Sequence, residues 1–178
     1  MNAGNRKAAF AMGEKLTRSD VKRIEEEIQH RKLVVRKEAL EAVKEARAQG
    51  DLSENFEYYA AKKDKNKNES RIRYLERMLK NAQIVSDESK DDEVGLNNTV
   101  EVYLEEDDEV ETYRLVTSIR GSSLNGLIST ESPLGKAIFK HKVGDRVEVK
   151  VNDQYSYYVV IRAIHNTKED ENDRIRSF

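Results

Sequence analysis

The chain has 178 residues, enough for one ordinary domain or for two small ones. Charged residues make up 37% of it, more than in a typical globular domain, which predicts long exposed helical surface or charged tails. Lys and Arg number 32 and Asp and Glu 34, and this near balance argues against a nucleic-acid binder that relies on a bulk positive field.

The sequence contains no cysteine, which excludes disulfides and thiolate zinc sites. The three histidines, His30, His141 and His165, are scattered without metal-ligand spacing. No apolar run approaches the ~20 residues of a membrane span, and Met1 to Gly13 lack the apolar core of a signal peptide. We therefore expect a cytoplasmic protein with no membrane partner.

Residues 14–86, which follow an N-terminal extension (1–13), are predicted to form a helical hairpin. Gly50 is the one glycine between Gly13 and Gly95, and no proline precedes Pro133. We expect a first arm from about Thr17 to Ala48, roughly 45–50 Å long at ~1.5 Å per residue. Its apolar residues recur at spacings of three, four or seven: Val21, Ile24, Ile28, Val35, Ala39, Ala42 and Ala46, with Leu40 and Val43 widening the stripe.

The second arm continues this coiled-coil pattern and carries a polar section. Ile72, Leu75, Leu79 and Ala82 keep the same spacing. The register extended backwards runs through Tyr58, Ala61, Lys65 and Asn68. Polar seam residues of this kind fix the register of a coiled coil at some cost in stability. The spacing therefore predicts an antiparallel pair with a polar middle.

The turn between the arms carries two acids with two interpretations. Gly50 stands where a glycine ends a helix, and Asp51 with Glu54 has the spacing of an N-cap and N3 pair for the second helix. The same spacing places both carboxylates on one helix face, where they could converge on a cation. Mg²⁺ takes oxygen ligands and keeps several waters, so this pair would be an incomplete site. The two interpretations are not exclusive.

The C-terminal half has the pattern of a small β-rich domain. An acidic linker (87–95) precedes it, and the domain is expected to span residues 96–166. A short helix is expected over Leu134 to Phe139, after Pro133. Residues 167–178 form a charged tail that we expect to be frayed. Alternating runs predict an antiparallel or mixed sheet with strands at 99–104, 112–116, 146–151 and 155–161.

Four segments resemble the signatures of a known family. The stretch Glu45 to Ala61, EARAQGDLSENFEYYAA, is similar to the tip signature of the bacterial Gre transcript cleavage factors, the GreA/GreB family. Ser132 to Ala137, SPLGKA, followed by Lys142 to Val149, KVGDRVEV, resembles the family's C-terminal signature, and Asn81 to Val85 resembles the close of its second helix. The resemblance covers about residues 12 to 165, with Phe56 where the family usually has a small residue.

The resemblance implies an α+β fold, with an N-terminal antiparallel α-helical coiled-coil hairpin and a C-terminal FKBP-like β-rich domain. It also implies a function. In this family the globular domain docks on bacterial RNA polymerase at the rim of the secondary channel, and the coiled-coil tip reaches the active centre. The polymerase then cleaves the 3′ end of a backtracked transcript. By this resemblance the protein is a monomer, takes no small-molecule substrate and is not an enzyme by itself.

The resemblance also implies roles for particular residues. Asp51 and Glu54 would help to hold the polymerase's second Mg²⁺, and the isolated protein would bind no cofactor stably. Contacts to the nascent RNA 3′ end or the polymerase would come from Arg47, Asn55, Lys62 and Lys63, with Lys65 and Lys67 nearby; a solvated helix face is the commoner reading of such charges. The expected polymerase-docking region is Ser132, Pro133, Leu134, Gly135 and Lys136, which also has the pattern of a turn and helix start. Tyr58 and Tyr59 could stack on a base, although the place of Tyr58 on the seam favours packing.

Three other functions are compatible with parts of the pattern. A Gre-like regulator could occupy the secondary channel and inhibit or modulate polymerase without stimulating cleavage; the Asp51 and Glu54 pair argues against this. An FKBP-like domain could be a prolyl isomerase, but the domain has no Trp and one internal Phe, Phe139, to line a pocket. A plain coiled-coil adaptor would tolerate substitutions at the tip.

Overall fold

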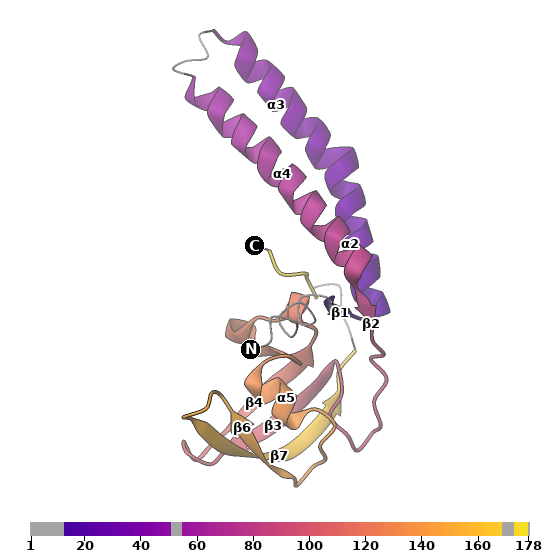
Figure 1. The fold of residues 1–178 in the computed structure, drawn as a ribbon, viewed down its shortest axis with the longest axis vertical. Coiled ribbons are helices and arrows are strands. Elements are labelled where there is room, and N and C mark those ends of the chain that lie inside the picture. Colours follow the sequence, from indigo (N-terminus) through magenta and orange to yellow (C-terminus); the bar gives the residue numbers. More distant parts are fainter. Residues whose placement is uncertain (1–12, 51–54, 169–172, 178) are drawn as a thin grey trace, which may run out of the picture. The chain divides into compact units, whose positions relative to one another are not determined.

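The computed structural model describes residues 13–50, 55–168 and 173–177. The chain forms two compact units: one contains the long helices between Arg18 and Gln83, and the other contains Lys15–Thr17 and the sheet from Ile84 onward. The predicted α+β class, a helical hairpin plus a β-rich domain, is confirmed (Figure 1). Within the described ranges, no helix has both the length and the apolar character needed to cross a bilayer.

The hairpin pairs a first arm of three helical segments with one long second helix. The first arm consists of α2 (Arg18–His30), the π-helical segment η1 (Arg31–Val35) and α3 (Arg36–Ala48). The second arm is α4 (Phe56–Asn81), which runs back beside the first arm (Figure 1). Ile24 and Ile28 from α2 and Ile72 and Leu75 from α4 are buried along the seam. The apolar spacing therefore forms one amphipathic seam per arm, as predicted.

Two residues expected on the seam of α3 do not face the opposite arm. Ala42 is exposed and Leu40 is 51% exposed, so these two expectations were wrong. Ala39 and Val43 are half-buried and Ala46 is buried, as expected. The seam thus runs from Ala39 to Ala46 through Val43, at spacings of four and three, where spacings of three and four through Ala42 had been expected. Both orders fit a period of 3.6 residues, so spacing alone does not separate them.

The polar section of the second arm is confirmed. Asn68 is buried, and Tyr58, Ala61 and Lys65 are half-buried along the predicted register. Near Asn68, Arg71 of α4 binds Glu27 of α2 with an Nε to Oε1 distance of 2.9 Å. The arms are thus held at this level by directional polar contacts as well as by apolar burial.

Asn55 caps the second arm and ties it to the first. Its Oδ1 accepts a hydrogen bond from the Tyr58 N–H at 2.9 Å, and its Nδ2 donates to the Ala46 carbonyl at 2.7 Å. Gly50 ends the first arm with φ +126°, a conformation that favours glycine. The prediction that Asp51 is the N-cap of the second helix, with Glu54 at N3, is wrong, because α4 begins at Phe56 with Asn55 as its N-cap. Asn carries both the acceptor and the donor that this position uses, whereas an Asp carboxylate is only an acceptor.

The second unit is built on a five-stranded mixed sheet in the order β5-β4-β3-β7-β6. All neighbouring strands are antiparallel except β4 and β5, which are parallel. The strands are β3 (Asn98–Leu104), β4 (Glu109–Val116), β5 (Leu127–Ser129), β6 (Arg146–Lys150) and β7 (Ser156–Asn166). Short strands β1 (Lys15–Leu16) and β2 (Gln83–Ile84) form a separate two-stranded sheet, and the 3-10 helices η2 (Ser118–Arg120) and η3 (Ser123–Asn125) lie between β4 and β5 in the chain.

One face of the sheet is covered by α5 (Pro133–Ile138), whose Leu134 and Ile138 join the core (Figure 1). The strand residues in this core alternate along each strand, as the period of two requires. Val94, which falls within the expected linker, is fully buried in the same core. The three residues of β5 gave no alternating pattern, so the sequence did not predict this strand. The other buried core members are Val100, Val102, Leu115, Val147, Val149, Val159 and Ile161.

The end of the chain returns to the sheet domain. Asp173 accepts two hydrogen bonds from Arg114 of β4, at 2.8 and 2.9 Å, and its side chain is 10% exposed. The Arg176 N–H donates to the Ile119 carbonyl at 2.7 Å. The expectation of a frayed tail was wrong for residues 173–177. Charge composition predicts solvation, but it does not reveal an arginine partner 59 positions earlier in the chain.

We predict that Asn55→Ala lowers the free energy of unfolding of the hairpin by about 1–2 kcal/mol, because it removes both a helix cap and a bond between the arms. Asn55→Asp should have an intermediate effect, since its carboxylate caps α4 but cannot donate to Ala46. Amide hydrogen exchange at the start of α4 and thermal melting would measure this. The matched control is Lys63→Ala, at an exposed position. Equal destabilisation by Ala and Asp would contradict the role of the bond to Ala46.

Replacing Asp173 should leave buried arginine charge behind in the sheet domain. We expect Asp173→Ala to destabilise this domain by about 3 kcal/mol, the lower end for removing one partner of a buried ion pair. Urea unfolding with hydrogen exchange of β4 is the measurement. Arg174→Ala, at an exposed neighbour in the same segment, is the control. Unchanged exchange in β4 after Asp173→Ala would show that the tail contributes nothing to the domain.

Candidate functional site

The acids Asp51 and Glu54 lie outside the described residues, in the connection between Gly50 and Asn55. The described residues on either side define where this connection starts and ends. The hydrogen bond from Asn55 to the Ala46 carbonyl closes the hairpin immediately behind it. The capping position of α4 is filled by Asn55, so helix capping no longer accounts for the two acids.

A basic cluster lies beside the tip, and we call Arg47, Tyr58, Lys62 and Lys65 the tip cluster. The guanidinium of Arg47 lies 5.5 Å from the centroid of the Tyr58 ring and donates through Nη2 to the Tyr58 Oη at 3.4 Å. The ring of Tyr59 meets the Tyr58 ring edge-on at 5.6 Å. Tyr58 therefore orients an arginine of the opposite arm, by a cation–π contact and a long hydrogen bond.

The electrostatics of Tyr58 show how positive this surface is. The hydrogen bond from Arg47 lowers the pKa of the Tyr58 phenol, and this outweighs the opposing effect of burial. The charges of Arg47, Lys62 and Lys65 lower that pKa further. Three cations thus act on one point near the tip of a chain whose net charge is −2. Such a local patch attracts anions, phosphate groups in particular, without a basic composition overall.

The predicted contact residues separate into three groups. Arg47 and Lys62 belong to the tip cluster. Lys63 is exposed on a different face of α4, since one residue turns an α-helix by about 100°. Asn55 uses its side chain to cap α4 and to bind Ala46. The sequence did not predict that Tyr58 belongs to the tip cluster. Its spacing of four residues from Lys62 does place the two side chains on one face of the helix.

The predicted docking region divides into buried and exposed residues. Ser132 caps α5: its Oγ accepts from the Gly135 N–H at 3.1 Å and donates to the Ser129 carbonyl at 2.6 Å. A Cβ on Gly135 would lie 2.0 Å from the Ser129 carbonyl oxygen, so this position requires glycine. Leu134 is buried in the core, whereas Pro133 and Lys136 are exposed. Only these last two side chains of the segment are available to a partner.

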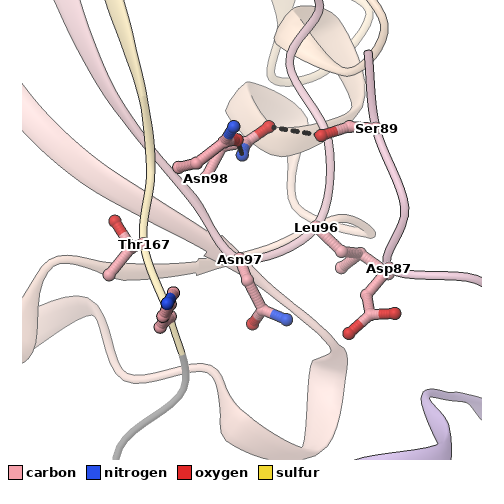
Figure 2. A pocket seen from close by; sticks show the side chains of 8 residues that line it. Asp87, Ser89, Leu96, Asn97, Asn98 and Thr167 are labelled. Atoms are coloured by element: carbon pink, nitrogen blue, oxygen red, sulfur yellow. Dashed lines mark hydrogen bonds between the residues drawn. The ribbon is translucent and has the colours of Figure 1, made fainter. Parts of the chain in front are cut away.

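A pocket of about 440 Å³ in the sheet domain is lined mainly by polar residues, with Asn98 bonded to Ser89 at its wall (Figure 2). The Asn98 Oδ1 accepts from the Gly95 N–H at 2.6 Å and from the Ser89 Oγ at 3.2 Å, and its Nδ2 donates to Asn166 at 2.6 Å. The Asn97 Oδ1 accepts from Arg120 at 2.9 Å. These bonds stabilise the edge of the domain. In the described part of the chain, no group of three or more His, Asp or Glu residues is placed to hold a metal ion.

Comparisons with known proteins agree with the division of the chain into a helical hairpin and a sheet domain. Residues 14–84 match the family "Transcription elongation factor, N-terminal", and residues 88–166 match "Transcription elongation factor, GreA/GreB, C-term". The transcription elongation factor GreA of Thermoanaerobacter pseudethanolicus is 47% identical over 137 residues, which cover 76% of this chain and 87% of that protein. The GreA of Lachnoclostridium phytofermentans is 41% identical over 148 residues, covering 82% and 92%.

Among solved structures, the chain is similar to the GreA factor homolog 1 (Gfh1) protein of Thermus thermophilus, with 27% identity, coverage of 86% of this chain and 99% of that one, and a TM-score of 0.40. The two family matches and the identities to the GreA proteins carry the assignment. The chain belongs to the GreA/GreB family of transcription elongation factors.

Proposed function

We propose that this protein binds bacterial RNA polymerase in the cytoplasm and stimulates cleavage of the 3′ end of backtracked transcripts. The coiled-coil hairpin enters the secondary channel, and its tip brings Asp51 and Glu54 to the polymerase active centre. The protein acts as a monomer and is not an enzyme by itself, because the reaction belongs to the polymerase. The observation that carries the proposal is the N-cap at Asn55, which leaves capping of α4 to a neutral residue and both tip acids for another use.

The donor set fits a magnesium ion that is shared with the polymerase. Mg²⁺ takes six oxygen ligands and usually keeps several waters, so two carboxylates supply the right atoms but too few for a stable site in the isolated protein. When bound between the two proteins, the ion would orient and activate a water for attack on the RNA phosphodiester. In this proposal, Asp51 and Glu54 contribute negative oxygen ligands.

The tip cluster supports a second contribution, to the RNA. A phosphodiester close to the tip would be attracted by Arg47, Lys62 and Lys65, whose charges converge at Tyr58. Tyr58 fixes the guanidinium of Arg47 before the RNA arrives, which reduces the ordering cost on binding. The cluster therefore favours a position for the displaced RNA 3′ end beside the acids.

The central test replaces the acids with neutral residues of the same shape. We expect Asp51→Asn and Glu54→Gln each to reduce stimulated cleavage by on the order of 100-fold, since each removes a charged metal ligand worth several kcal/mol. Binding to polymerase and the melting temperature should be unchanged. The measurement is RNA 3′ cleavage in stalled elongation complexes, with factor binding followed by competition. The control is Ser53→Ala, which replaces a neutral residue between the two acids in the sequence.

If Asp51→Asn or Glu54→Gln stimulates cleavage as well as the unaltered protein, the replaced acid is not a metal ligand. If the unaltered protein binds polymerase but slows cleavage, it is instead an inhibiting regulator of the same channel.

A second test compares two adjacent lysines. Lys62→Ala removes one charge of the tip cluster, so we expect roughly a three- to tenfold higher factor concentration for half-maximal cleavage, with a weaker dependence on salt. Lys63→Ala removes the same charge from another face of α4 and should have a smaller effect. Cleavage assays at several salt concentrations measure both. Equal effects of the two variants would mean that the cluster has no particular role.

A further inference from the structure

Four polar residues interlock the two arms of the hairpin, and we call Glu27, Arg31, Asn68 and Arg71 the polar clasp. The Glu27 Oε1 accepts from the Arg31 Nε at 2.7 Å and from the Arg71 Nε at 2.9 Å, while its Oε2 accepts from the Arg71 Nη2 at 3.2 Å. The Arg31 Nη1 donates to the Asn68 Oδ1 at 3.1 Å, and the Asn68 Nδ2 donates to the Arg31 carbonyl at 3.3 Å. Both arms supply donors and acceptors.

The clasp is partly shielded from water. The Arg71 side chain is 7% exposed and Asn68 is 4% exposed, whereas the Glu27 and Arg31 side chains are 23% and 29% exposed. Burial raises the pKa of the Glu27 carboxyl, but the hydrogen bonds from Arg71 and Arg31 and their charges outweigh it, so the net pKa lies below the usual 4.5. Glu27 is therefore charged at neutral pH. Its contribution to stability is fully present above the usual glutamate pKa and is lost as pH falls through the lowered value.

The π-helical segment and Asn68 belong to the same arrangement. Arg31 is the first residue of η1, and its carbonyl accepts from the Arg36 N–H five residues later. The same carbonyl also accepts from Asn68 of the opposite arm. A shift of one arm along the other would separate Asn68 from this π turn. The π turn of the first arm, which contains one residue more than an α-helical turn, thus pairs with Asn68 of the second arm.

Apolar packing does little to fix the register beyond the clasp. Towards the tip, Ala46 is the one described residue of α3 that is both apolar and buried, while Ala39 and Val43 of α3 and Ala61 of α4 are half-buried. Small apolar side chains allow several axial positions, because burial has no direction. Hydrogen bonds have direction and specify one axial position. Beside the clasp, Arg36 donates to the two carboxylate oxygens of Glu69 at 2.7 and 2.9 Å, and this pair is consistent with the same register.

We propose that Glu27, Asn68 and Arg71 are positioning residues, which fix the axial register of the two arms and thereby the position of the tip. A slip of one helical turn would move one arm by about 5.4 Å along the other and break the bond between Asn55 and Ala46. A misplacement of even about 1 Å can cost on the order of 100-fold in rate. The consequence for cleavage rests on the proposed function, whereas the register can be measured without polymerase.

The chemistry of buried charge separates this role from a role in stability. Replacing a buried ion pair with apolar residues of similar volume is often neutral or stabilising. Polar seam residues can nevertheless specify the register of a coiled coil. The clasp should therefore be dispensable for folding and necessary for a single alignment of the arms.

The experiment replaces the whole clasp with apolar side chains in the full chain, as the quadruple variant Glu27→Leu, Arg31→Met, Asn68→Leu and Arg71→Met. Because the chain has no cysteine, spin labels attach only at introduced cysteines, here Glu41→Cys and Arg77→Cys at exposed positions of opposite arms. These sites are offset along the hairpin, so a slip changes their separation. The matched control is Lys32→Met with Glu76→Leu, which removes an exposed pair between the arms with an Nζ to Oε1 distance of 2.5 Å.

We expect one narrow label separation in the parent and in the control. The clasp variant should melt at the same or a higher temperature and show a second separation shifted by about 5 Å. Its stimulation of cleavage should fall at least about 10-fold, while the control keeps the parental rate. A single parental separation in the clasp variant overturns the proposal, and so does a changed register with full cleavage.

Two further measurements keep the outcome clear. If the quadruple variant does not fold, Asn68→Leu alone removes the bonds between Asn68 and Arg31 and leaves Glu27 paired with Arg31 and Arg71. This single variant should still broaden the label separation, and a parental distribution would overturn the proposal. If the parent stimulates no cleavage, the proposed function fails, yet the label distances still decide whether the clasp sets the register.

Discussion

The carboxylate of Glu27 binds a guanidinium from each arm, and the alignment of the whole hairpin depends on this shared contact. Its partners Arg31 and Arg71 extend it to Asn68 and to the π turn of the first arm. Nearer the tip, the pair of Arg36 with Glu69 and the bond from Asn55 to the Ala46 carbonyl also join the arms, and they can form only in the alignment that this contact specifies. A long arm without a defined register would present its end over a range of positions, which a metal site does not tolerate.

The sequence predicted features that depend on periodicity and missed those that depend on particular partners. The two arms, the polar seam at Asn68 and four of the five strands of the main sheet follow from spacing alone. The sequence did not predict the π turn at Arg31–Val35, whose first carbonyl also accepts a hydrogen bond from Asn68 of the opposite arm. Asn55 displaced Asp51 as the helix cap, since its second bond reaches Ala46 across the turn. For the candidate site, the motif supplied Asp51 and Glu54, and the structure added Tyr58 as the residue that holds Arg47.

In the proposed function, the parts of the chain have separate roles. Two tip acids are too few to hold a Mg²⁺ ion by themselves, so in this proposal they act only inside RNA polymerase. The tip cluster adds positive charge beside them, and the sheet domain offers Pro133 and Lys136 on an otherwise structural segment. We propose that Asp51 completes a metal site in the active centre of RNA polymerase.

This role of Asp51 is tested most directly by changing the metal ion that supports stimulated transcript cleavage. The variant Asp51→Cys offers a thiolate, which binds soft metal ions such as Cd²⁺ far better than Mg²⁺. We predict that this variant fails to stimulate transcript cleavage with Mg²⁺ alone and recovers part of it when Cd²⁺ is added, relative to the unaltered factor and to polymerase without factor. Full activity with Mg²⁺ alone, or no recovery with Cd²⁺ while polymerase binding is intact, would contradict the account.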